Sequence, residues 1–326
     1  MKTKKLFTMA DRLSLSNTSW AKQSFTMAEI LISLTIIGVI AAITLPALRA
    51  NINEKTWATQ KKALFSRMSQ AVALLDSVNS YTDAQSFITN GLNEVLKINN
   101  ICAFESLNDC GVDTKQLITT AGSARTFPLN WYTLATVTNF GSFYNDSTSF
   151  MTTNNTDLAG AFETVNGESV VVYYNPNCIP NGEDSPILEE DEQPNLFKYV
   201  CANLIYDLNQ DKGPNTVGKD IGFMTIFYAT DPVVASVVPS TTAKQAISSD
   251  AENSCKDDYR IPNIEEAASM QLNWSILGGG NAYQGMLTSS RAVNGNDTYV
   301  YKVSAKPDLK RISDTATTGY TRCVKR

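Results

Sequence analysis

The chain has 326 residues, of which 43% are hydrophobic and 18% are charged, and its formal net charge is −5 at pH 7. This length exceeds the ~100 to 150 residues typical of one domain, so we expect one or two globular units beside any membrane segment. Residues 1–24 contain five basic residues and one acidic residue, a net charge of +4, so the remainder carries −5 minus 4, or −9. Nucleic-acid binding needs clustered Lys and Arg, and the acidic remainder argues against it.

A long apolar segment runs from Phe25 to Leu48. No charged side chain occurs between Ile30 and Leu45, and the apolar run reaches about the ~20 residues that a helix needs to cross the hydrocarbon core of a membrane. Glu29 lies at the entrance of this run, where an ionised carboxylate in lipid costs roughly 2.5 to 3.5 kcal/mol. A charge kept at that cost suggests a function.

Two general interpretations of this segment leave features unexplained. A secretory signal peptide has an apolar core of only ~7 to 15 residues, and Leu48 and Arg49 interrupt the small-residue pattern that its cleavage needs. A plain transmembrane anchor explains the length of the run, but neither Glu29 nor Pro46, since a proline kinks or ends a helix.

The run Phe25 to Glu29, followed by the apolar stretch and Pro46, resembles the prepilin-type cleavage and methylation motif of type IV pilins and type II secretion pseudopilins. In that family a prepilin peptidase cuts before the Phe, and the new N-terminal amine is methylated. The resemblance implies that Glu29 neutralises the amine of Phe25 on a neighbouring subunit, and many members also have a proline at the position of Pro46. The family usually has Gly before the cut, where this chain has Ser24.

The family resemblance also implies a location and partners. The basic leader favours retention of the N-terminus in the cytoplasm. We therefore expect a single-pass protein of the inner membrane, with its body periplasmic or extracellular, that joins a filament after processing. Its expected partners are the prepilin peptidase and other pilin or pseudopilin subunits.

After Pro46 the apolar residues recur at spacings of three, four and seven, which predicts an amphipathic helix to about Ser80. We expect the apolar stripe to pack on the globular body from Leu64 onward. The residues of the stripe are Trp57, Leu64, Phe65, Met68, Val72, Leu75 and Val78.

The expected organisation has four parts: a leader at 1–24, a transmembrane and amphipathic helix at 25–80, a pilin-like body at 81–239 and a C-terminal module at 240–326. Within the body, Ser169–Tyr174 and Ile221–Tyr228 read as strands because they are rich in β-branched and aromatic residues. The predicted fold class is α+β, with the long N-terminal helix packed on an antiparallel sheet and a small disulfide-tied module at the C-terminus.

Six cysteines in an exported chain favour disulfides over metal ligands or nucleophiles. The sequence has no His, which removes the commonest zinc ligand and the usual base for a nucleophilic Cys or Ser. Many pairings are open to six cysteines, and proximity is only a guide. Proximity favours Cys102 with Cys110, Cys178 with Cys201, and Cys255 with Cys323.

One stretch of the body is a candidate cation site. Oxygen-bearing side chains recur there at short intervals, with Gly213 and Pro214 forcing a turn, which suits a hard cation such as Ca²⁺. No Glu closes the loop as in an EF-hand, and the alternative is an Asx-rich loop whose side chains cap their own backbone. The candidate ligands are Asp207, Asn209, Asp211, Asn215 and Asp220.

The segment from about Ser240 onward contains, in this order, Cys255, Tyr259 to Pro262, Glu265, Glu266, Thr288 to Ser290 and Tyr320 to Lys325. These residues resemble a compact C-type-lectin-like module found at the ends of bacterial surface proteins. That module has a Cys before an Arg-Leu-Pro-Thr turn and helix, a Ser-Ser strand and a closing Arg-Cys-Val-Arg. Here Ile261 and Asn263 replace the Leu and the Thr. The resemblance implies a fold often used for ligand or glycan contact.

Within this segment the residues themselves predict a helix start. Asn263 is a suitable N-cap, and Glu265 and Glu266 lie in the first turn, where the helix dipole favours acids. A bond between Cys255 and Cys323 would tie the two ends of the module together.

These features predict a structural minor pilin or pseudopilin that is inserted in the membrane and assembled through its N-terminal helix. The alternative is a membrane-anchored surface or tip adhesin that binds a ligand through the C-terminal module. We do not expect an enzyme, because the neighbouring acids Glu265 and Glu266 point in different directions on one turn and are poorly placed for glycoside hydrolysis. Ca²⁺ is the only cofactor for which the sequence gives a candidate site.

Overall fold

The computed structural model divides the chain into two compact units, Met1–Asn53 and Glu54–Arg326. Ser24 and Phe25, the residues of the predicted cleavage site, lie outside the described residues. The structure describes residues 26–112, 115–120, 122–127, 159–176, 178, 199–210, 212–228, 233–236, 244–247, 255, 258–273, 277, 286–294, 297–303, 309–313 and 318–325.

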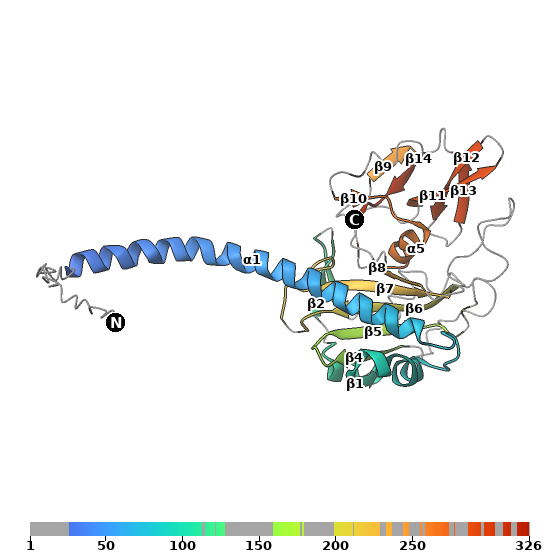
Figure 1. The fold of residues 1–326 in the computed structure, drawn as a ribbon, viewed down its shortest axis with the longest axis horizontal. Helices are drawn as coiled ribbons and strands as arrows, with labels where there is room; N and C mark the ends of the chain where they lie inside the picture. The colour runs from blue at the N-terminus through green and yellow to red at the C-terminus, as the bar shows by residue number, and fades with distance from the viewer. Residues whose placement is uncertain are drawn as a thin grey trace, which may run out of the picture. The chain divides into compact units, whose positions relative to one another are not determined.

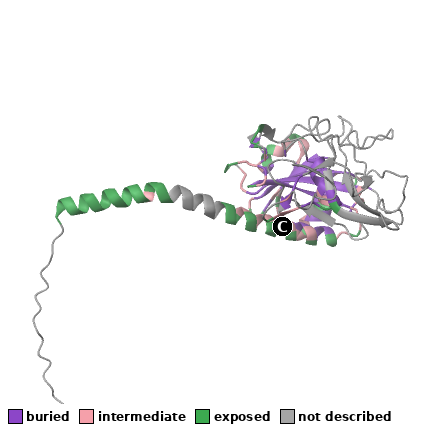
Figure 2. Ribbon diagram, turned by 90° about the horizontal axis from the view of Figure 1, so that it is seen from above, coloured by how far each residue is buried: buried purple, intermediate pink, exposed green. Residues whose placement is uncertain are grey.

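The first unit contains the beginning of a long helix, α1 (Met27–Ala73), which continues through Pro46. Its window Met27–Thr44 is long and apolar enough to cross a membrane, and Figure 2 shows this part as exposed. The hydroxyls of Thr35 and Thr44 donate to the carbonyl oxygens of Leu31 and Ile40, four residues earlier. These side-chain donors are therefore satisfied within the helix, as an apolar surrounding requires.

The second unit is built on a six-stranded antiparallel sheet with the strand order β1-β4-β5-β6-β7-β8 (Figure 1). Neighbours in this order are antiparallel throughout. The predicted strand Ser169–Tyr174 coincides with β5, and the prediction Ile221–Tyr228 exceeds β7 by one residue. The strands are β1 (Ile98–Ala103), β4 (Ala159–Thr164), β5 (Ser169–Tyr174), β6 (Val200–Asp207), β7 (Ile221–Phe227) and β8 (Val233–Ser236).

Both faces of this sheet are covered, since every residue of β5, β6 and β7 is buried. Side chains alternate across a strand, and the two buried clusters follow that alternation. One cluster combines Leu64, Met68 and Val72 of α1 with sheet residues such as Val172 and Leu204. Four stripe residues that the sequence predicted, Leu64, Met68, Val72 and Val78, are fully buried.

The opposite face of the sheet packs on a second helix, α5 (Ile264–Leu272). Its residues Ala267 and Met270 share a buried cluster with Tyr173 of β5 and Phe223 of β7. The antiparallel sheet with its helices agrees with the predicted α+β class.

The predicted end of the first helix was wrong, because α1 ends at Ala73 and not near Ser80. The amide of Leu75 bonds to the carbonyl of Val72, three residues earlier, which tightens the last turn. The chain then bends, and the hydroxyl of Tyr174 donates to the carbonyl oxygen of Val78 at 2.8 Å.

Short elements connect these layers. They are α2 (Ala84–Ser86), the π-helix η1 (Phe87–Leu92), α3 (Asn93–Leu96), the 3₁₀ helix η2 (Phe104–Cys110) and the hairpin of β2 (Lys115–Ile118) with β3 (Ala124–Phe127).

The C-terminal strands form a second sheet with the order β13-β12-β11-β14-β9, in which β11 and β14 run parallel. A two-stranded ladder pairs β10 with β15, near the end of the chain. These strands are β9 (Lys244–Ile247), β10 (Tyr259–Arg260), β11 (Met286–Asn294), β12 (Asp297–Val303), β13 (Leu309–Ser313), β14 (Thr318–Thr321) and β15 (Val324–Lys325).

Three disulfides close the second unit and use all six cysteines. They join the pairs that proximity favoured, Cys102–Cys110, Cys178–Cys201 and Cys255–Cys323. The first of them links the edge strand β1 to the last residue of η2.

Candidate functional site

The N-terminal end of α1 carries a capping box made by Thr26 and Glu29. The amide of Glu29 donates to Oγ1 of Thr26 at 3.3 Å, and the amide and hydroxyl of Thr26 both donate to Oε2 of Glu29 at 2.9 Å. The first amides of a helix have no partner within the helix, and reciprocal bonds of this kind satisfy two of them. Sequence reasoning assigned Glu29 to assembly and missed this local role, although the Thr-x-x-Glu spacing is its known signature.

Beyond the cap, the first unit shows apolar side chains on every side of the helix. The large side chains in the window from Met27 to Thr44 are 48% to 82% exposed. A helix that is apolar all round needs lipid or other protein around it. The described part of the chain gives it no such cover within the first unit.

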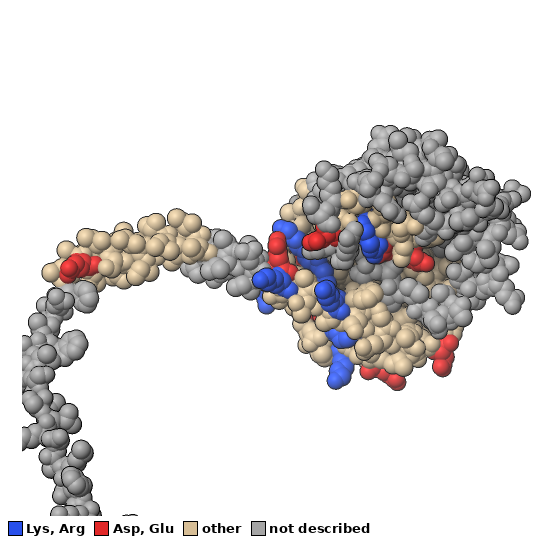
Figure 3. All heavy atoms as spheres, turned by 45° about the horizontal axis from the view of Figure 1, so that its top comes forward, with Lys and Arg blue, Asp and Glu red and all other residues tan. Residues whose placement is uncertain are grey.

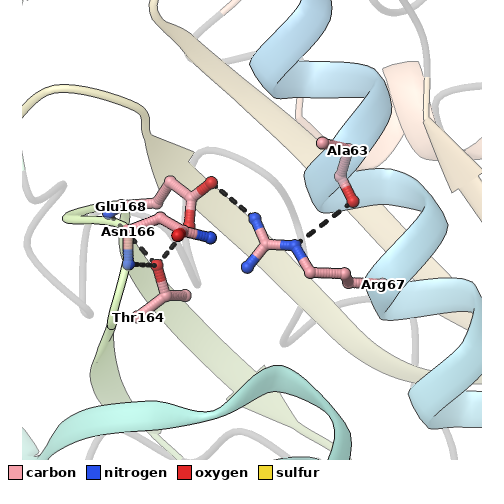
Figure 4. A network of polar contacts seen from close by, with 5 residues as sticks. All are labelled: Ala63, Arg67, Thr164, Asn166 and Glu168. Atoms are coloured by element: carbon pink, nitrogen blue, oxygen red, sulfur yellow. Dashed lines mark hydrogen bonds and ion pairs between the residues drawn. The ribbon is translucent and has the colours of Figure 1, made fainter.

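The second half of α1 is fixed to the sheet by a polar network (Figure 4). Nη2 of Arg67 contacts Oε1 of Glu168 at 2.5 Å, and the side chains are 22% and 3% exposed. The hydroxyl of Thr164 donates to the other carboxylate oxygen of Glu168, and Nε of Arg67 donates to the carbonyl of Ala63 at 3.3 Å. Glu168 stands at the turn between β4 and β5, so this pair anchors the helix to that hairpin.

Basic side chains gather beside this anchor. Nζ of Lys61 donates to the carbonyl oxygen of Gly218, which brings α1 next to the turn that carries the exposed Lys219. Lys62 is exposed on the same stretch of helix, and Figure 3 shows Lys and Arg side chains grouped on this face of the second unit.

The loop from Asp207 to Asp220 uses its described carboxylates for its own backbone. The two oxygens of Asp220 accept the amides of Asn215 and Thr216, each at 2.8 Å, and Oδ1 of Asp207 accepts the amide of Asn209 at 3.0 Å. This arrangement is that of the Asx-rich alternative. Asp211, the remaining candidate ligand, lies outside the described residues.

Two oxygens in this loop, Oδ1 of Asn209 and Oδ1 of Asn215, are nevertheless buried without a hydrogen-bond partner among the described residues. Within the described residues, no group of three or more His, Cys, Asp or Glu side chains is arranged to hold a metal ion. The Ca²⁺ site therefore stays a prediction.

The motif residues of the C-terminal segment come together and serve its internal structure. Arg260 makes a bidentate contact with Glu266, at 2.7 and 2.6 Å. Asn263 and Glu266 form the capping box of α5, with reciprocal bonds of 2.7 and 2.9 Å. The predicted N-cap at Asn263 is confirmed, and the amide of Ser289 bonds to the carbonyl of Pro262 at 2.8 Å.

Arg322 of the closing motif is fully buried. Its Nη2 donates to the hydroxyl of Thr120 and, at 3.4 Å, to the carbonyl oxygen of Leu277. Burial lowers the pKa of this guanidinium to about 10, and the charged form still prevails at neutral pH. The neighbouring Cys323 is bonded to Cys255, so a disulfide joins the beginning of the motif to its closing residues.

The described motif residues therefore supply packing and internal hydrogen bonds, and the helix start at Thr26 and Glu29 is the stronger candidate for function. No family model matches the chain, and no curated protein or solved structure is significantly similar to it.

Proposed function

We propose that the chain is a structural filament subunit, a minor pilin or pseudopilin of a type IV pilus or type II secretion filament. The observation that carries this proposal is the first part of α1, which is apolar and exposed from Met27 to Thr44 and starts with the Thr26–Glu29 cap. A secreted soluble body has no use for such a helix. A subunit that first rests in lipid and then packs among like helices needs one.

In this proposal the inner membrane holds the precursor, with its N-terminus in the cytoplasm. The prepilin peptidase cuts between Ser24 and Phe25, and the freed amine of Phe25 is methylated. Glu29 then lies four residues from the new N-terminus, within the first turn of α1. Pairing this carboxylate with the amine of a neighbouring subunit offsets the cost of the charge in an apolar surrounding.

The anchor at Arg67 and Glu168 gives the second half of α1 a different role. Leu64, Met68 and Val72 are buried in the second unit, so this face of the helix is not free to join a helix bundle. Among the described residues of α1, the large exposed apolar side chains lie between Met27 and Ile43, and we assign assembly to this part of the helix.

The experiment is to express the full chain with a prepilin peptidase and to determine the N-terminus of the membrane-extracted protein. We expect a methylated Phe25, and more complete processing in a Ser24→Gly variant. An intact Met1 in both proteins would refute the proposal and leave a plain anchor.

Assembly is tested separately with Glu29→Ala, because family peptidases act on the bond before Phe25. We expect this variant to insert and to be processed, but to be lost from sheared filament fractions. Glu54→Ala is the matched control, since Glu54 is an exposed acid on the same helix. Normal filament recovery with Glu29→Ala would contradict the role of Glu29. If the Glu29→Ala protein also still binds a ligand through its C-terminal segment, the adhesin alternative gains support.

A further inference from the structure

A buried polar cluster lies between the six-stranded sheet and α5. Asn203 belongs to β6 and Thr225 to β7, and they face Ser269 of α5 and Asn273 at its C-terminal end. All four residues are 0% exposed. The cluster is surrounded by apolar side chains of the same layer, among them Ala268 of α5.

The hydrogen bonds of this cluster link all four side chains. The amides of Asn203 and Asn273 bond reciprocally, Nδ2 to Oδ1, at 2.9 and 3.0 Å. The hydroxyl of Thr225 donates to Oδ1 of Asn203 at 3.1 Å and lies 2.6 Å from the hydroxyl of Ser269. The second Nδ2 hydrogen of Asn273 goes to the carbonyl oxygen of Ser269 at 2.8 Å. Since the hydroxyl proton of Thr225 is used by Asn203, Ser269 is the donor to Thr225.

These directional bonds allow one placement of α5. A shift of the helix by one residue moves it ~1.5 Å along its axis and turns each side chain by about 100°. Asn203 and Thr225 would then face apolar atoms with their polar groups unpaired, which a buried site penalises strongly. Apolar contacts alone tolerate such shifts far better because they have no fixed direction.

No disulfide joins the two sides of this interface. Cys102–Cys110 and Cys178–Cys201 lie before β8, and Cys255–Cys323 lies after it. Strand β8 ends at Ser236 in the first sheet, and β9 begins at Lys244 in the second. A cut between these two residues would leave only non-covalent contacts between the parts.

We propose that Asn203, Thr225, Ser269 and Asn273 form a polar latch that fixes the C-terminal segment on the sheet in a single register. The C-terminal segment is then an integral layer of the body, and α1 on one face of the sheet is mechanically coupled to α5 on the other. This proposal does not rest on the filament function.

The test is a specific protease site placed between Ser236 and Lys244 of the full chain in detergent, with the disulfides intact. After cleavage we expect the two parts to co-elute in size-exclusion chromatography. Asn203→Ala and Asn273→Ala should each weaken their association at least tenfold. In the double variant, the association of the two parts should be weakened no more than in the worse of the two single variants. Asn99→Ala is the matched control, because Asn99 is exposed on β1, and it should match the unsubstituted protein.

A second measurement, made on the uncut protein, keeps the proposal testable if a variant folds poorly. Hydrogen exchange of the uncut protein should show faster exchange of the α5 amides in Thr225→Val, which keeps the shape of Thr225 but lacks its hydroxyl. Separation of the unsubstituted parts after cleavage would overturn the proposal, as would association of Asn203→Ala as tight as that of Asn99→Ala.

Discussion

The ion pair of Arg67 with Glu168 yields a quantitative prediction for the anchorage of α1. Arg67→Ala leaves the carboxylate of Glu168, which is 3% exposed, with Thr164 as its only described side-chain partner. Removing one partner of a fully buried pair costs about 3 to 5 kcal/mol, whereas exposed pairs contribute only about 0 to 1 kcal/mol. The side chain of Arg67 is 22% exposed, so water reaches the vacated site and we expect a loss of about 2 kcal/mol, between those limits.

The assay is thermal unfolding of the full chain in detergent, followed by circular dichroism. For a body of this size, 1 kcal/mol corresponds to roughly 2 to 4 °C, so Arg67→Ala should lower the midpoint by about 4 to 8 °C. Lys62→Ala is the control, since Lys62 is an exposed basic residue on the same helix, and surface changes usually stay within about 0.5 kcal/mol.

A double-variant cycle separates the ion pair from other effects of truncating Arg67. Glu168→Gln alone should also destabilise, and the combined variant should lose less than the two single losses added together, by about 1 kcal/mol or more. Equal midpoints for Arg67→Ala and Lys62→Ala would refute the reasoning, and so would strict additivity in the cycle.

Four further outcomes are expected. Thr26→Ala removes the side-chain cap of α1 and should speed hydrogen exchange in its first turn, at a cost of about 1 kcal/mol. Gln271→Met should raise the thermal midpoint, because Oε1 of Gln271 is buried without a partner in the described structure and such a group costs about 1 to 3 kcal/mol. Burial raises the pKa of Asp83, but hydrogen bonds from Ser86 and Thr82 outweigh it and hold the pKa below its usual value. Asp83 therefore adds stability above its unfolded pKa that is lost as pH falls towards its folded pKa, and Asp83→Asn should remove this part of the acid dependence in a pH series. Added Ca²⁺ should leave the midpoint unchanged, because both oxygens of Asp220 already accept amides; a rise with Ca²⁺ concentration would revive the cation site.

Local features were predictable where a few neighbouring residues decide the structure. Asn263 is predictable as an N-cap because Asn is a favoured residue at that position and acids follow it in the first turn, and the structure forms a capping box there. The burial of Leu64, Met68 and Val72 was also predictable, because their spacing of four residues places them on one side of a helix. The cap at Thr26 has an equally local signal, since Thr26 and Glu29 have the Thr-x-x-Glu spacing of a capping box.

Features that depend on distant residues were not predictable from one sequence. Asn203 bonds to Asn273, which is 70 positions away, and Thr120 bonds to Arg322, which is 202 positions away. The order of the strands in a sheet depends on pairings between distant residues, and the hydrophobic periodicity of a single segment does not predict it. The end of α1 belongs here too, since Val78, beyond that end, bonds to Tyr174, 96 positions away.

The position of polar groups along α1 connects these observations. In the first unit Thr35 and Thr44 bond to the helix itself, and Glu29 bonds to the cap residue Thr26. In the second unit Thr59 and Nε of Arg67 also bond within the helix, but Lys61 and Nη2 of Arg67 reach other elements, at Gly218 and Glu168. A helix that satisfies its own polar groups can exchange one apolar surrounding for another without losing hydrogen bonds, whereas one tied to a sheet cannot. Under the proposed function, residues 27–44 would exchange lipid for protein while Lys61 and Arg67 stay bonded to the body.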